Sequence, residues 1–175
     1  MEFMATLTKE KFEPTPAILK GYAFEDAITA YCEIAAPPDN EAVREIGDLV
    51  KGGLWQQKVS ADLPDVLGMK IRLSGVADVI KGDTIYDIKR AGSYDIGKYA
   101  ESLQHLIYLH CTQIPKFRYC IGYGSGENPS GVAYEDYSLD AKTLPTIKQK
   151  CAELLGWLDN SNLLQIYKKH WYINE

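Results

Sequence analysis

The apolar positions of the N-terminal part of the chain recur at helical spacing. Between residues 16 and 35 they fall on one helical face, with proline at the start of the run and two prolines beyond its end. We therefore expect a helix over residues 16–35. Asp39 or Asn40 can cap a second helix, and the pair Gly52-Gly53 is typical of a helix end.

Beyond this pair of glycines the pattern changes to an alternation of polar and apolar residues, which is typical of strands. Each such run is bounded by turn-forming residues, and Gly82-Asp83 suits a type II′ hairpin turn between two of them. The expected strands are residues 55–62, 70–80, 85–90, 117–123 and 132–139.

Helical spacing of apolar residues returns in three places. The expected helices are residues 95–112, 144–158 and 163–171. The order of elements is then ααβββαββαα, which places the chain in the α/β class, more narrowly α+β. No repeat or linker interrupts the pattern, so we expect one domain over residues 1–175.

Composition narrows the choice of function. The 175 residues carry a formal net charge of −5, which argues against binding nucleic acid or an anionic membrane through bulk charge. The four cysteines form no Cys-x-x-Cys pair, which favours free thiols in a reducing compartment over a metal cluster. The first 15 residues lack the apolar core of a signal peptide, and no run approaches the length of a membrane span. We expect a cytoplasmic protein.

The hairpin around Gly82-Asp83 brings charged residues together. In its register Asp78 lies opposite Asp87, and Lys89 shares their face while Ala77 and Val79, with Tyr86 and Ile88, form an apolar face that packs inward. Two carboxylates opposed across a ladder repel each other, so a divalent cation such as Mg²⁺ or Mn²⁺ is a natural companion. The alternative for Asp-x-Lys alone is a surface salt bridge.

Four short motifs occur in an order that resembles the PD-(D/E)XK nuclease superfamily, in its RecB-like and phage-exonuclease-like branch. They are Gly21-Tyr-Ala-Phe-Glu25, Gly75-Val-Ala-Asp78, Asp87-Ile-Lys89 and Gln104-His-Leu-Ile-Tyr108. Ala77 stands where the strict family motif has proline. The resemblance implies a restriction-endonuclease-like αβββαβ core, with a central mixed sheet flanked by helices.

The resemblance also implies roles for these residues. Glu25, Asp78 and Asp87 would hold Mg²⁺ or Mn²⁺ together with the main-chain carbonyl of Ile88. Lys89 would assist the attacking water. The catalytic set would further include Gln104 and Tyr108, which support the site or contact substrate in the family.

Several of these positions also have a purely structural interpretation. Glu25 alone would be a solvated helical residue, and Gln104 with Tyr108 an ordinary pair on a helix surface. Gly21 either opens room beside Glu25 or marks a close contact between helix and sheet.

Nucleic-acid contacts must be local in a chain with this charge. Arg90, Tyr94 and Lys98 follow the predicted active strand and are candidates to bind phosphate or stack on a base. The aromatic and basic run 167–172 is either a packed helix face or a DNA-binding tail.

We expect a metal-dependent DNA nuclease, with an exonuclease favoured over an endonuclease by resemblance to the branch. The grouped cysteines of relatives with an iron–sulfur cluster are missing after the core, so no such cluster is expected. DNA would be the substrate, and no association with a membrane is expected. Whether the chain forms a homo-oligomer or binds a recombination or repair protein stays open. The alternative is a catalytically silent nuclease-fold module that binds nucleic acid or protein.

Overall fold

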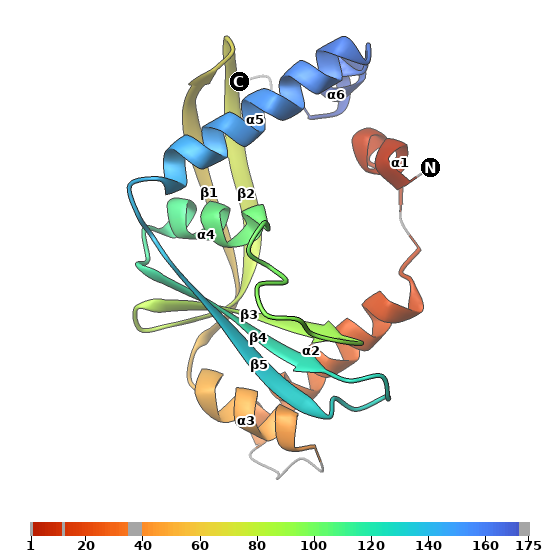
Figure 1. Ribbon diagram of the computed structural model, residues 1–175, viewed down its shortest axis with the longest axis vertical. Helices are drawn as coiled ribbons and strands as arrows, with labels where there is room; N and C mark the ends of the chain where they lie inside the picture. Colours follow the sequence, from red (N-terminus) through yellow and green to blue (C-terminus); the bar gives the residue numbers. More distant parts are fainter. Residues whose placement is uncertain (1, 12, 35–39, 172–175) are drawn as a thin grey trace.

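The computed structural model of the protein describes residues 2–11, 13–34 and 40–171. Its helices and strands follow the expected order, with one additional helix at the N-terminus (Figure 1). From the N-terminus they are α1 (Glu2–Thr8), α2 (Pro16–Ile34), α3 (Glu41–Val50), β1 (Leu54–Val66), β2 (Met69–Lys81), β3 (Thr84–Ala91), α4 (Leu103–Thr112), β4 (Lys116–Tyr123), β5 (Gly131–Ser138), α5 (Thr143–Asn160) and α6 (Leu164–Trp171).

The two predicted N-terminal helices are present. Asn40 is the cap of α3, because its side chain accepts a hydrogen bond from the Val43 amide at 3.1 Å. Asp39, the other expected cap, and residue 35, the expected end of α2, lie outside the described residues.

The five strands form one mixed sheet in the order β1-β2-β3-β4-β5. β3 and β4 are parallel, and the other neighbouring strands are antiparallel. Two parallel neighbours need a crossover, and α4 supplies it. Helices lie on both sides of the sheet (Figure 1). The predicted α+β class with a mixed sheet and flanking helices is confirmed.

The hairpin of β2 and β3 has the predicted register only near its turn. Gly82 has a φ of +60°, which suits the first central position of a type II′ turn. The paired residues are Val79 with Tyr86, Ile80 with Ile85 and Lys81 with Thr84. Beyond Val79 the two strands separate: the rest of β2 pairs with β1 alone, and the rest of β3 pairs with β4 alone.

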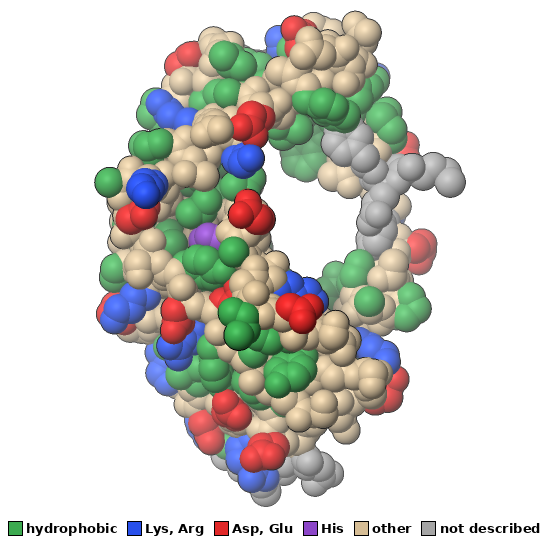
Figure 2. Space-filling view, in the orientation of Figure 1, with side chains coloured by type: hydrophobic (Ala, Val, Ile, Leu, Met, Phe, Trp, Pro, Cys, Tyr) green, Lys and Arg blue, Asp and Glu red, His purple; other side chains and the backbone are tan. Residues whose placement is uncertain are grey.

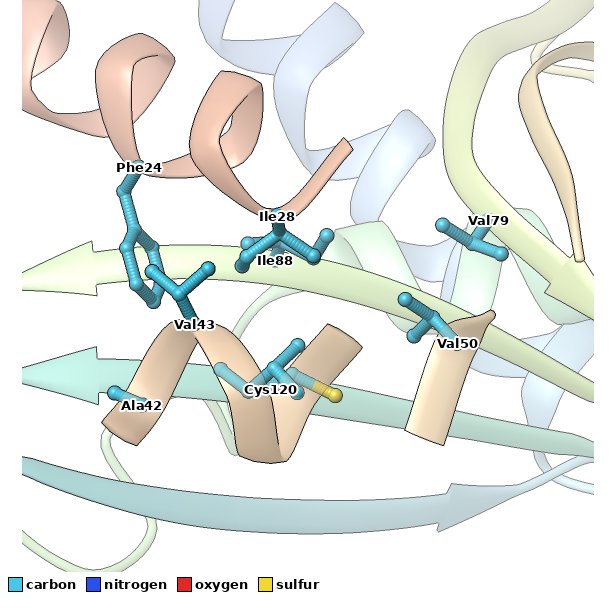
Figure 3. Packing of buried hydrophobic residues seen from close by; sticks show 9 residues of the cluster. Phe24, Ile28, Ala42, Val43, Val50, Val79, Ile88 and Cys120 are labelled. Carbon is cyan, nitrogen blue, oxygen red and sulfur yellow. The ribbon is translucent and has the colours of Figure 1, made fainter. Parts of the chain in front are cut away.

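Two apolar clusters enclose the sheet. On one face α2 and α3 pack against the strands, and Figure 3 shows Phe24 and Ile28 of α2 close to Val43 of α3 and Ile88 of β3. On the other face Tyr108 and Leu109 of α4 belong to a cluster with residues of all five strands. A third cluster joins α5 to the outer part of the β1–β2 hairpin.

The β1–β2 ribbon changes face at one point. Val79 belongs to the cluster under α2 and α3, whereas Ala77, two residues earlier, belongs to the cluster under α4. The expectation that both share one face with Tyr86 and Ile88 is therefore wrong for Ala77. The cause is in β1, where Gln56 adopts a left-handed φ of +50° and leaves the ladder.

The helix expected over residues 95–112 begins only at Leu103, with Ser102 as its cap. Residues 95–102 form successive turns instead, and Gly97 has a φ of +79°. The buried carboxylate of Glu135 on β5 accepts a hydrogen bond from the Tyr99 amide at 3.2 Å. This contact from a distant strand replaces helical hydrogen bonding here.

The first and last helices meet. Trp171 Nε1 of α6 donates a hydrogen bond to the Leu7 carbonyl of α1 at 2.9 Å. Figure 2 shows an opening near the middle of the molecule in this view, and acidic and basic side chains are interspersed around it. Within the described residues, no helix has both the length and the apolar character needed to cross a bilayer.

Candidate active site

The separation of β2 from β3 defines the candidate site. Asp78 and Asp87 would have formed the next pair of the hairpin, and this expected pair is absent. Instead Asp78 Oδ2 accepts a hydrogen bond from the Ile88 amide at 2.8 Å. The Asp78 side chain thus bridges the two strands just where their main chains part.

Asp87 is the most deeply buried charged residue of the site, with no exposed surface. Lys89 Nζ lies 2.5 Å from Asp87 Oδ2, and Gln104 Nε2 of α4 donates to Asp87 Oδ1 at 2.5 Å. The expectation that Asp87 projects outward is wrong, because α4 covers this face of β3. Apart from Lys89, Asp87 Oδ2 has no hydrogen-bond donor among the described residues.

Gln104 and Tyr108 are not an ordinary surface pair. The Tyr108 hydroxyl donates to the Val76 carbonyl at 2.8 Å, and Gln104 Nε2 lies 3.5 Å from that hydroxyl. A Cβ placed on Gly75 would lie 2.4 Å from the Tyr108 ring. Glycine at this position therefore lets α4 approach β2, so that the pair can reach both β2 and Asp87.

Glu25 approaches from α2 on the other side of the strands. It is half-buried, and Gln56 Nε2 of β1 donates a hydrogen bond to its Oε1. Four residues before it, a Cβ placed on Gly21 would meet no heavy atom within 4 Å. The close contact of helix and sheet at Gly21 is therefore absent, and the glycine leaves open space one turn from Glu25.

The acidic groups share an electrostatic environment. Burial raises the pKa of Glu25 to about 7, and the charge of Asp78 adds to the rise. Burial also raises the pKa of Asp87 to about 7 against the opposing effect of Lys89. Burial raises the pKa of Asp78 as well. Burial opposes the charge of Lys89 too, but Asp87 beside it raises the pKa of Lys89.

Gln56 is the site residue that the sequence patterns miss. Its left-handed φ removes it from the strand and brings its amide to Glu25, while its would-be partner Asp78 stays unpaired in the β1–β2 ladder. A left-handed conformation is costly for a residue with a Cβ. No periodicity signals it, since the run around Trp55 alternates like any strand.

The donor chemistry of the site fits a hard divalent cation. Among the described residues no group of three His, Cys, Asp or Glu is already gathered as a metal centre. Asp87 Oδ2 is nevertheless a buried oxygen with a spare acceptor position, and a bound cation would favour the charged forms of carboxyl groups whose pKa values are raised by burial. Carboxylate oxygens of Glu25, Asp78 and Asp87 are ligands that suit Mg²⁺ or Mn²⁺.

Of the three residues expected to contact nucleic acid, Arg90 lies near the end of β3, and Tyr94 and Lys98 follow this strand. The Arg90 guanidinium donates to the carbonyls of Gly124 at 2.9 Å and Gly126 at 2.8 Å, so it positions the glycine-rich loop. Tyr94 packs on Tyr123 with ring centroids 5.8 Å apart. Lys98 is exposed and donates to the Ser93 carbonyl at 3.0 Å. Contacts of these residues with phosphate or base stay predictions.

Comparison with known proteins gives similarity of structure alone. No protein-family model matches the chain, and no curated protein matches it. The solved structure of a "Putative exonuclease" from Eubacterium rectale is similar with a TM-score of 0.50 and 12% identity, over 95% of this chain and 73% of that chain. The structure of SSO0001 is similar with a TM-score of 0.48 and 16% identity, over 89% of this chain and 87% of that chain.

These findings define the class of fold. The mixed five-stranded sheet with flanking helices is consistent with a restriction-endonuclease-like fold, and the Eubacterium rectale structure is similar to this chain in fold. At 12% identity this likeness concerns the fold; the chemistry rests on the residues of the site.

Proposed function

We propose that the protein is a Mg²⁺- or Mn²⁺-dependent deoxyribonuclease. The observation that carries the proposal is the meeting of Asp78, Asp87 and Lys89 where β2 and β3 separate, with Glu25 approaching from α2. Carboxylates that share a divalent cation beside a lysine suit hydrolysis of a phosphodiester bond. The name of the structural neighbour from Eubacterium rectale agrees with a nuclease.

In this proposal Glu25, Asp78 and Asp87 would hold the metal ion, together with the Ile88 carbonyl. The bound ion would polarise the phosphate and lower the pKa of water. Lys89 would donate a hydrogen bond to the attacking water or to the phosphate oxygens, where negative charge develops. Gln104 positions Asp87, and Tyr108 holds α4 against β2.

The products follow from the balance of the reaction. Water adds its oxygen to phosphorus, the bond from phosphorus to the bridging oxygen breaks, and a proton passes to the leaving oxygen. We favour attack at DNA ends, as in the branch that the four motifs resemble. No residue of the site by itself selects ends.

The test is digestion of end-labelled linear DNA and of closed circular DNA in the presence of Mn²⁺. We expect loss of the linear form and abolition of cleavage by Lys89→Ala. Lys116→Ala is the matched control, because Lys116 also pairs with an aspartate, Asp83 at 2.8 Å, but lies exposed at the far end of the β3–β4 ladder. It should cleave like the wild type.

Other outcomes are decisive as well. Cleavage of the circular form would replace exonuclease by endonuclease. A metal-binding enzyme should gain thermal stability with Mn²⁺ and lose that gain in Asp87→Ala. Absence of both cleavage and stabilisation by Mn²⁺ would contradict the nuclease and support the silent binding module.

A further inference from the structure

A groove lies along the outer part of the β1–β2 hairpin. The facing pairs Lys58–Val76, Ser60–Ser74 and Asp62–Arg72 all have exposed side chains. The groove has a volume of about 440 Å³, and Lys58, Ser60, Arg72, Ser74 and Val76 line it. Val76 belongs to the Gly75-Val-Ala-Asp78 motif, whereas Lys58, Ser60, Arg72 and Ser74 lie outside the four motifs.

The hairpin face that carries the groove begins next to the candidate active site, because the strand changes face at Gln56. Before this residue Trp55 packs toward α2 and α3; beyond it Val59 packs toward α4. Alternate residues of a strand point to opposite faces, so Lys58 and Ser60 face the side from which α2 approaches. Gln56 itself contacts Glu25. The polar face of the hairpin therefore begins beside the carboxylates.

The charges of the groove suit an anion. Lys58 has no ion pair or hydrogen bond among the described residues, which leaves its ammonium group available. Arg72 holds Asp62 through two hydrogen bonds of 2.6 and 3.0 Å, so the acidic residue of this face is neutralised. Ser60 and Ser74 supply hydroxyl groups between these two positions.

We propose that this groove binds the phosphates of the DNA strand that leads to the scissile bond. Lys58 makes the main charged contact, and the hydroxyls of Ser60 and Ser74 bond to phosphate oxygens. The occupant is a nucleic-acid backbone because Lys58 offers an ammonium group, unpaired among the described residues, near two hydroxyl groups in a chain of net charge −5, and the hairpin face that carries them begins at Gln56, which contacts Glu25. The inference rests on the proposed nuclease function and locates its substrate strand.

The test compares Lys58→Gln with Lys142→Gln in two measurements. Lys142 is a matched control, because it is an exposed lysine at the start of α5, which packs on the opposite face of the hairpin. Anisotropy of a labelled DNA oligonucleotide in EDTA gives the affinity at several salt concentrations. Cleavage with Mn²⁺ then gives kcat and KM.

We expect Lys58→Gln to weaken binding about three- to tenfold at low salt. The slope of log affinity against log salt should become smaller by about 0.7–0.9, the value of one phosphate contact. KM should rise by a similar factor at unchanged kcat, since the contact is the same in the ground and transition states. Lys142→Gln should change none of these quantities.

The outcomes separate this inference from the proposed function. If the wild type cleaves DNA but Lys58→Gln binds and cleaves like it, the proposed role of the groove is wrong and the proposed nuclease function is kept. If the wild type does not cleave but binds DNA with a salt slope that depends on Lys58, the groove stands and the nuclease is wrong. A wild type that neither cleaves nor binds DNA overturns both.

Discussion

Asp78 occupies an unusual position among the residues of the sheet. It pairs with neither Gln56 on one side nor Asp87 on the other, although the residues next to it pair normally. Its carboxylate binds the Ile88 amide, so a side chain takes over a hydrogen bond that a ladder would otherwise make. The two gaps are what allow acidic groups from both sides of the sheet to approach each other.

Gln56 gives a test of this arrangement. Gln56→Gly keeps the left-handed backbone, which glycine adopts without strain, but removes the amide that holds Glu25. We expect cleavage activity to fall about 10- to 100-fold while stability is kept or raised. Activity with Mn²⁺ and denaturant unfolding measure the two effects.

Leu67→Gly is the control for the backbone effect. Leu67 also has a left-handed φ, +52°, but it is exposed at the tip of the β1–β2 hairpin. It should gain stability without losing activity. Full activity of Gln56→Gly would show that Glu25 does not need this hydrogen bond.

The raised carboxylate pKa values predict how the stability of the metal-free protein depends on pH. Glu25 and Asp87 have a pKa of about 7 when folded and about 4 when unfolded, so between these values the folded state binds more protons. The contribution of these two protonated carboxyl groups to the stability of the folded state is complete below pH 4 and is lost as pH rises through 7. Lys89 titrates far above this range.

The midpoint temperature of thermal unfolding should therefore decrease as the pH is raised from 5 to 7.5, at constant ionic strength and with EDTA present. Asp87→Asn should flatten this dependence, since its side chain does not titrate. A midpoint that rises over the same range would contradict the raised pKa values of these two groups.

At this scale the sequence predicts which side chains meet better than how they are held. Strand alternation places Asp87 and Lys89 on one face, the resemblance to the nuclease superfamily adds Gln104 to the site, and the structure has these contacts. The burial of Asp87 could not be predicted, because it depends on how α4 packs on β3. Arg90 shows the same limit, since its guanidinium binds a loop more than 30 residues away.

Among the elements, α4 shows best how packing decides local structure. Ile96 fits the helical period of residues 95–112, yet 97% of it is exposed in a segment of turns. Periodicity cannot detect that a carboxylate on β5 binds the Tyr99 amide. The strands were predicted to within a few residues because turn-forming residues bound most of them, and β1 extends past its expected end by pairing with β2.

The close contact of α4 with β2 predicts how a methyl group added at Gly75 changes the stability of the protein. Gly75→Ala would place a Cβ 2.4 Å from the Tyr108 ring, which must shift together with α4. We expect a loss of about 1–3 kcal/mol in the free energy of unfolding, measured with urea. Gly21→Ala, in open space within α2, should raise it by about 0.5–1 kcal/mol. Equal effects of both substitutions would contradict the close packing at Gly75.

On the scale of the whole molecule, the sheet consists of two parts that diverge. β3, β4 and β5 stay together under helices, whereas the outer β1–β2 ribbon turns away after a short shared ladder (Figure 1). The order of elements was predictable from period and turns, and so was the fold class. The divergence was not, because a change of face at Gln56 and Asp78 leaves the alternation of the sequence intact.

The same irregular β1 is an outer strand of the sheet, where unpaired main-chain groups can recruit a strand from another molecule. Gln56 interrupts it near one end, and the register shifts between Leu63 and Val66, around Pro64, near the other. Between these two points residues 57–63 keep regular pairing with β2, and Lys58 and Asp62 put opposite charges on this stretch. A strand added at this edge would find a short, charged template with a distorted end on each side, so the distortion that opens the site also protects the sheet against aggregation.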